Sequence, residues 1–177
     1  MLFEVYLKIG DKDKQADLAK DLLVNQHDTQ YYAVLKQLFS ESSVWDAEYP
    51  SLLERLGQAL PYHLYLDILS KEGETRRLLT VVSVHPSSVF NYGKQLSMEF
   101  PKETYVLCID EIRRQAAEAD NRIKYKKVCS VIKKLFEFGG VAETESVITE
   151  LKEKYSRRPA MLEELNSLAV KLSMKRK

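Results

Sequence analysis

The sequence predicts an all-α fold, and three observations support this prediction. Apolar residues recur at helical spacing along nearly the whole chain of 177 residues. Six Gly and five Pro are too few for the closely spaced turns of a β-sandwich or β-barrel. Hydrophobic residues make up 45% of the chain and charged residues 30%, the ordinary mixture of a soluble folded protein. We therefore expect an array of about ten short helices.

The N-terminal part of the chain carries clear signals for where helices begin and end. Gly10 is expected to end the first helix, and Asp11 or Asp13 to cap the second. The third helix follows a break at residues 27–29, and the fourth contains Pro50, which either kinks it or starts a new helix. The side chains expected to face inward from the first three helices are Phe3, Tyr6, Leu7, Ala16, Ala19, Leu22, Leu23, Tyr31, Leu35, Leu38 and Phe39.

The middle of the chain is harder to assign. Pro61 suits the first turn of a helix that Gly73 ends. The β-branched run TVVSV at residues 80–84 would fit a strand in isolation. No partner strand is visible nearby, however, and helices are predicted on both sides. We therefore interpret residues 74–84 as a buried helix.

Further helices are predicted as far as the C-terminus. Pro86, Pro101 and Pro159 are each placed to open a helix, because proline is favoured in the first helical turn. Asn121 can cap the longest amphipathic helix, which ends at residues 139–140. Together these signals leave only short connections between neighbouring helices.

Several features recur along the chain. Gly10, Gly73 and Gly140 each end a predicted helix and are followed closely by an acidic residue and another helix. Their separations, 63 and 67 residues, are about twice the length of a common helical-hairpin repeat. An aromatic–Leu–aromatic triplet also occurs twice, at Tyr31, Leu35 and Phe39 and at Tyr92, Leu96 and Phe100. Because a helix pair cannot bury both apolar faces alone, we predict an α-α superhelix, or TPR-like helical-repeat array. An irregular helical bundle is the alternative.

We expect residues 1–177 to form a single helical-repeat domain with an uneven charge distribution. Residues 1–100 carry 10 Lys/Arg and 14 Asp/Glu, a net charge of −4. Residues 101–177 carry 17 Lys/Arg and 12 Asp/Glu, a net charge of +5. An acidic half followed by a basic half can steer a charged partner.

Cysteine usage and hydropathy indicate a cytoplasmic protein. Cys108 and Cys129 are the only cysteines, and two isolated thiols are too few for a zinc site or a dense disulfide framework. No apolar run approaches the roughly 20 residues that span a bilayer. The first fifteen residues lack the basic start and long apolar core of a signal peptide. We expect no membrane association.

Catalytic and metal-binding patterns are not found in the sequence. His27, His63 and His85 are far apart and none has the spacing of a known metal motif. His63 and Asp67 lie one helical turn apart and are read as a surface hydrogen bond rather than as metal ligands. Neither phosphate-binding glycine loops nor a GxSxG nucleophile motif occurs. We predict no enzyme activity, no catalytic residue, no metal and no cofactor.

Basic residues gather on one predicted helix near the C-terminus. Lys126, Lys127, Lys133 and Lys134 are placed opposite the apolar stripe of that helix, and Arg157 and Arg158 add further positive charge. These six residues are our candidate contacts with a nucleic acid or another partner. Such an arrangement can neutralise phosphates, although a solvated helix face with interspersed carboxylates has the same pattern.

The tyrosines divide into expected core residues and candidate anchors for a partner. Those expected to wedge between stacked helices are Tyr31, Tyr92 and Tyr125. Those that include possible exposed anchors are Tyr32, Tyr62 and Tyr65. For any single tyrosine, packing in the core is the better interpretation.

The last third of the chain resembles a known family. The stretch FPKETYVLCIDEIRRQAAEADNRIKYKKVCSVIKKLFEFGG, followed by a helix and KYSRRPAMLEELNSL, is similar to the C-terminal helical region of bacterial SWIM zinc-finger family proteins. The match covers residues 101–168 and includes an AxxRxxY pattern, a Gly-Gly break and an Arg-Arg-Pro before the final helix.

The resemblance implies a helical segment that accompanies a separate zinc-binding module, and that module is thought to contact DNA or protein. The module needs a CxCx(n)CxH set, which this chain lacks. The resemblance therefore implies a C-terminal fragment and transfers no metal ligand to it. It leaves Arg157 and Arg158 a structural role, in which we expect them to pair with Glu163 or Glu164.

The functional prediction is a non-catalytic helical-repeat scaffold that binds a protein or peptide partner or supports a neighbouring domain. The alternative is a nucleic-acid-binding helical domain that uses the basic residues 101–177.

Overall fold

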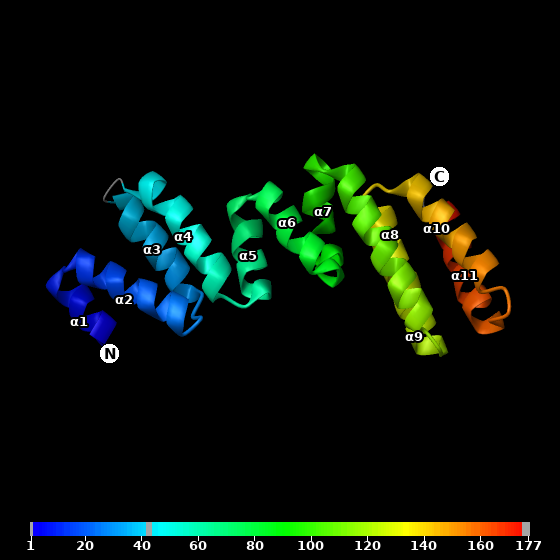
Figure 1. The fold of residues 1–177 in the computed structure, drawn as a ribbon, viewed down its shortest axis with the longest axis horizontal. Coiled ribbons are helices and arrows are strands. Elements are labelled where there is room, and N and C mark those ends of the chain that lie inside the picture. Colours follow the sequence, from blue (N-terminus) through cyan, green and yellow to red (C-terminus); the bar gives the residue numbers. More distant parts are fainter. Residues whose placement is uncertain (1, 42–43, 175–177) are drawn as a thin grey trace. The chain divides into compact units, whose positions relative to one another are not determined.

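The structure, a computed structural model, describes residues 2–41 and 44–174, apart from the side chains of residues 2–4 and 7. Within these ranges the regular structure is helical throughout and contains no strand, which confirms the all-α prediction (Figure 1). The predicted inward positions Phe3 and Leu7 lie outside the described side chains.

The helices follow one another with short connections. They are α1 (Leu2–Ile9), α2 (Lys12–Asn25), α3 (Gln30–Glu41), α4 (Trp45–Ala59), α5 (Tyr62–Glu72), α6 (Thr75–Val84), α7 (Val89–Glu99), α8 (Pro101–Glu118), α9 (Arg122–Glu137), α10 (Val141–Lys154) and α11 (Pro159–Met174), with the short 3-10 helix η1 (Pro86–Ser88) before α7. Asp11 and Asn121 cap α2 and α9 by accepting hydrogen bonds from backbone N–H groups, as predicted. Pro50 lies within α4, which continues through it as one helix.

The chain divides into two units, Met1–Ile68 and Leu69–Lys177, called here the first and second units. The boundary falls inside α5. Each unit is described separately, and the single domain over residues 1–177 remains a prediction.

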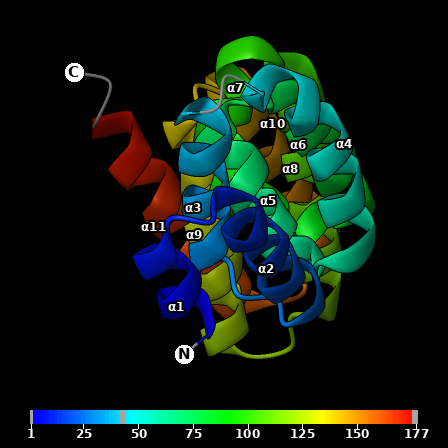
Figure 2. The same cartoon turned by 90° about the vertical axis from the view of Figure 1, so that its left-hand side faces the viewer.

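In the first unit, α2 packs against α1, α3 and α4 (Figures 1 and 2). Leu23, Leu35, Leu53 and Leu56 are completely buried at its centre. The Trp45 ring at the start of α4 meets Tyr32 edge-on, with the ring centroids 6.2 Å apart. An edge-to-face aromatic pair adds to the stabilisation from buried area. The start of α4 thus packs against α3 through the contact between Trp45 and Tyr32.

The inward-facing position at the start of α3 differs from the prediction. Tyr32 is buried, whereas Tyr31 is half-buried. Adjacent helical residues differ in direction by about 100° because a turn contains 3.6 residues. The contact with Trp45 favours the orientation that buries Tyr32. Tyr32 and Tyr65, proposed above as possible exposed anchors, are both core residues.

In the second unit, each helix from α6 to α11 packs against the next along the chain. Contacts also join helices two apart along the chain, since α7 packs on α9, α8 on α10 and α9 on α11. The completely buried side chains at these contacts include Leu78, Leu96, Ile112, Ile132, Leu135, Leu151 and Leu165. Residues 75–84 form the helix α6, as predicted, because burial of Leu78, Leu79 and Val82 on one face outweighs the β-propensity of the run. The expectation that this helix is buried is wrong, because its other face is exposed and Val84 is 72% exposed.

The left-handed glycine after α9 is not the one expected. Gly10 and Gly73 have φ angles of +71° and +74° and follow α1 and α5, as predicted. After α9, however, Gly139 takes the positive φ of +101°, and Gly140 is the N-cap of α10. Glycine is favoured at such positions because a side chain strains the left-handed conformation.

Helix α7 and the end of α9 approach each other closely at Gly93. A methyl group added at Gly93 would meet three carbons of the Phe138 ring, one of them at 2.7 Å. The Phe138 carbonyl accepts a hydrogen bond of 3.1 Å from the Tyr105 hydroxyl. Gly93 therefore leaves the space into which the Phe138 ring fits.

Replacing Gly93 with Ala tests this contact. Within a helix the change by itself adds about 1 kcal/mol of stability, whereas overpacking costs about 1–3 kcal/mol. We expect Gly93→Ala to lower the free energy of unfolding, measured with urea, by about 1 kcal/mol. In a Phe138→Ala background the clash is absent, and the same change should raise that free energy. An equal effect in both backgrounds would contradict the contact.

Candidate binding cleft

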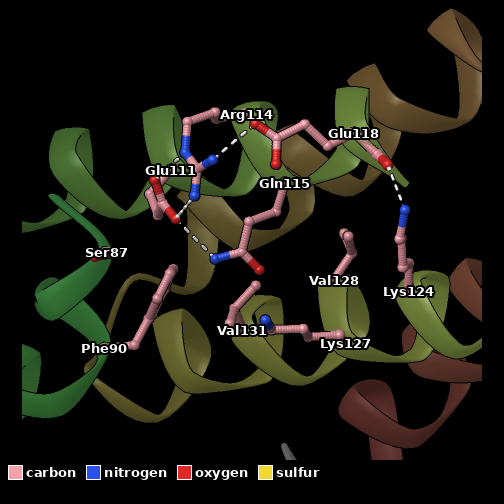
Figure 3. A pocket seen from close by; sticks show the side chains of 10 residues that line it. All are labelled: Ser87, Phe90, Glu111, Arg114, Gln115, Glu118, Lys124, Lys127, Val128 and Val131. Carbon is pink, nitrogen blue, oxygen red and sulfur yellow. Dashed lines mark hydrogen bonds and ion pairs between the residues drawn. The ribbon is translucent and has the colours of Figure 1, made fainter. Parts of the chain in front are cut away.

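The cleft in the second unit arises from unequal helix lengths. Helix α8 has 18 residues and α7 has 11, so α8 continues about 10 Å beyond the start of its antiparallel neighbour. The last turns of α8 and the first turns of α9 are therefore only partly covered by η1 and α7. A cleft of about 380 Å³ lies between these four elements (Figure 3).

The floor of the cleft is apolar. Phe90 from α7 and Val128 and Val131 from α9 line it, with exposed fractions of 6%, 1% and 8%. The two valines lie on the face of α9 that packs into the second unit. Apolar surface that lines a concave site is typical of ligand-binding clefts.

The wall formed by α8 carries a buried carboxylate. The Glu111 side chain is 2% exposed and accepts hydrogen bonds from Arg114 Nε and Nη2, at 2.7 and 2.6 Å. Gln115 Nε2 donates a third bond of 2.8 Å. The hydrogen bonds from Arg114, with smaller contributions from Gln115 and the charge of Lys127, hold the pKa of Glu111 below its ordinary value. Glu111 is therefore ionised at neutral pH.

Arg114 is held on both sides. Its Nη1 donates a bond of 2.7 Å to Glu118, in addition to the pair with Glu111. These carboxylates raise the pKa of the guanidinium, with Glu111 the larger influence. Because two carboxylates fix its plane, Arg114 presents a preoriented group at the rim of the cleft.

Gln115 carries an unused acceptor. Its Nε2 is bonded to Glu111, whereas its Oε1 is shielded from solvent and has no hydrogen-bond partner among the described residues. A buried polar atom without a partner costs about 1–3 kcal/mol. Figure 3 shows the Gln115 carboxamide directed from α8 toward α9, across from Lys127 and Val131.

The two lysines of the cleft differ in their partners. Lys124 pairs with Asp120 at 3.0 Å and also donates to the Glu118 carbonyl. Lys127 forms no ion pair with any side chain that the structure describes. The lining therefore contains three cationic and two anionic side chains, and Asp120, outside the lining, pairs with Lys124. Lys127 is the cation of the lining that lacks an ion-pair partner among the described side chains.

The six basic residues predicted as contacts are not brought together in the structure. Lys127 lines the cleft, Lys134 donates to the Phe90 carbonyl at 3.2 Å, and Lys133 pairs with Glu137 at 3.3 Å. Lys126 and Arg157 are exposed.

Arg158 has a structural role. It donates a bond of 2.7 Å to the Ala119 carbonyl and lies over the Tyr155 ring, 4.5 Å from its centre. The ion pairs predicted between Arg157 or Arg158 and Glu163 or Glu164 are not formed among the described side chains. Glu163 and Glu164 pair with Arg122 instead.

Sequence reasoning missed Glu111, Arg114 and Gln115. Their signal was present as the i, i+3 and i+4 spacing of Glu111, Arg114, Gln115 and Glu118 on one helix face. The sequence did not reveal that this face is left partly uncovered. That depends on the length of α7 relative to α8.

A second depression lies between α6 and α8, with a volume of about 480 Å³. It is lined mainly by Leu79, Val106 and Leu107, and Val106 is 57% exposed. Lys102 and Glu103 stand beside it. It offers apolar surface but lacks the fixed polar groups of the cleft.

Groups that commonly carry catalysis are not assembled in the described parts of the chain. No cluster of three or more His, Cys, Asp or Glu side chains there is placed to hold a metal ion. Burial raises the pKa of the Cys108 thiol to about 12 and that of Cys129 to about 11. Because the thiolate is the reactive form, neither thiol is activated. Among the described helices none is both long and apolar enough to cross a membrane.

Comparisons of the chain with protein-family models, curated proteins and solved structures find no match. The resemblance of residues 101–168 to SWIM zinc-finger family proteins therefore stays a prediction.

Replacing Glu111 with Gln tests the charged wall of the cleft. The variant keeps the shape but weakens the bonds to Arg114, so we expect the free energy of unfolding at pH 7 to fall by about 1–2 kcal/mol. The folded-state pKa of Glu111 lies below its ordinary value of 4.5. The contribution of the Glu111 charge to the free energy of unfolding is therefore fully present above pH 4.5. It is lost as the pH falls through the folded-state pKa of Glu111.

The measurement is urea denaturation of both proteins from pH 7 to acid, where the difference between them should disappear. Glu118→Gln, which changes an exposed partner of the same arginine, should have little effect. A Glu111→Gln penalty that persists unchanged in acid would contradict the assigned charge.

Proposed function

We propose that the chain is a non-catalytic helical-repeat scaffold that binds a protein or peptide partner through the cleft between α7, α8 and α9. Two reduced thiols and no disulfide among the described residues favour a cytoplasmic location. Partner binding by stacked helices depends on shape and on a few fixed polar groups rather than on a reaction.

The contacts between helices support a repeat arrangement. In a TPR-like or similar array, each helix packs on its neighbour and on the equivalent helix of the next pair. The contacts of α7 with α9, α8 with α10 and α9 with α11 follow this order. The same order occurs in the first unit, where α2 packs on both α3 and α4.

The observation that carries the proposal is the composition of the cleft. It joins an apolar floor to a preoriented arginine, a buried carboxylate, an unused amide acceptor and an available ammonium. A site of about 380 Å³ accepts side chains from a partner segment but not a whole helix, whose diameter is about 10–12 Å. Fixed polar groups around an apolar floor favour selective binding of such a segment.

The nucleic-acid alternative has weaker support. It requires several cations facing one phosphate backbone, with affinity that falls steeply as salt rises. Of the six predicted cations, Lys133, Lys134 and Arg158 are engaged by groups of the chain itself. Glu111 and Glu118 line the same cleft as Lys127 and disfavour a phosphate there.

The proposed function predicts that the full chain selects short peptides from a random displayed library. A labelled selected peptide, titrated by fluorescence anisotropy, should bind Val131→Ala about fivefold more weakly, because methyl contacts on the floor are lost. Val106→Ala, the same substitution in the α6–α8 depression at a more exposed position, is the control and should leave affinity unchanged. Circular dichroism of each variant checks that its helices are retained.

Failure to select any peptide would count against a peptide-binding scaffold. A loss of affinity in Val106→Ala, with Val131→Ala unaffected, would contradict the cleft and place binding at the α6–α8 depression.

A further inference from the structure

One cation of the cleft has no ion-pair partner among the described side chains. Arg114 is engaged by Glu111 and Glu118, and Lys124 by Asp120. Lys127 has no ion-pair partner among the described residues, although its charge is felt at Glu111. A ligand that places one negative charge beside Lys127 therefore supplies the ion-pair partner that this ammonium lacks.

Lys127 lies next to the apolar floor of the cleft. Lys127 and Val131 are four residues apart on α9, so their side chains share one face, and Val128 lies beside them. Figure 3 shows the Lys127 side chain next to Val131. A ligand that pairs with Lys127 thus holds an apolar group close enough to rest on Val128, Val131 and Phe90.

We propose that the cleft recognises a short peptide segment in which a carboxylate side chain lies within two residues of an apolar side chain, the carboxylate pairing with Lys127 and the apolar side chain covering Val131. This inference rests on the proposed function and specifies the chemistry of the partner.

Charge selects a carboxylate over a phosphate. Lys127 offers one ammonium without an ion-pair partner among the described side chains, which a single negative charge matches. A phosphate brings about two charges near pH 7 and would stand close to Glu111 and Glu118. Like charges held together in a partly buried site disfavour binding, so the carboxylates of α8 exclude the more highly charged group.

The unused acceptor selects a peptide over a fatty acid. Both offer a carboxylate and an apolar group, but only a peptide backbone also offers N–H donors. Gln115 Oε1 needs a donor and faces the Lys127 side of the cleft. Because this oxygen is shielded in the free chain, a bound segment displaces a neighbouring side chain before its backbone N–H donates to Gln115 Oε1.

The test is a reversal of charge at Lys127, with its neighbour as the control. Random peptides are selected on the full chain, on Lys127→Glu and on Lys126→Glu. Lys126 is adjacent on α9, is also exposed and does not line the cleft. The wild type and Lys126→Glu should enrich Asp or Glu within two residues of an apolar residue, and Lys127→Glu should enrich Lys or Arg there instead.

The selected acidic peptide should bind Lys127→Glu about tenfold more weakly than the wild type, and Lys126→Glu with nearly unchanged affinity. Sodium octanoate should not displace it. Peptides enriched without this charge preference, a preference unchanged in Lys127→Glu, or displacement by octanoate would each overturn the inference while the scaffold function stands. No enrichment on any of the three proteins would overturn both.

Discussion

Burial of the apolar face of α9 is the interaction on which the second unit depends. Val128, Ile132 and Leu135 lie on that face, and α7, α8, α10 and α11 all pack against the helix. No single helix pair covers so wide a stripe, so stacking of successive helices is the physical solution. Close fit at Gly93, where the Phe138 ring fills the space of a side chain, then sets how α7 meets the end of α9.

The same packing produces the cleft. Because α8 and α9 are longer than α7, a cleft remains at their joined ends, with Val128 and Val131 of α9 in its floor. Burying Glu111 beside them is unfavourable unless its charge is compensated, and Arg114 and Gln115 provide that compensation. The resulting site has a rigid, charged wall on α8 and one flexible cation, Lys127, on α9. The fixed groups on α8 favour selective binding, and the Lys127 side chain can adapt its position to the ligand.

Local chemistry made much of the fold predictable. The caps at Asp11 and Asn121 and the helix starts at Pro101 and Pro159 depend on neighbouring residues alone, and the structure has them where the sequence indicated. Features set by distant contacts were not predictable in the same way. Tyr32 rather than Tyr31 is buried and contacts Trp45, and the Phe90 carbonyl engages Lys134 from 44 residues away. The cleft itself follows from relative helix lengths, which no local pattern contains.

The central claim is that the cleft between α7, α8 and α9 is the binding surface of the chain. The most direct measurement is NMR chemical-shift mapping of the full, isotope-labelled chain as a selected peptide is added. The account predicts that the largest amide shifts fall on Gln115, Lys127, Val128 and Val131, around the cleft. Shifts confined to Val106 and Leu107 in the α6–α8 depression, or to Lys126 and Lys133 on the outer face of α9, would contradict it.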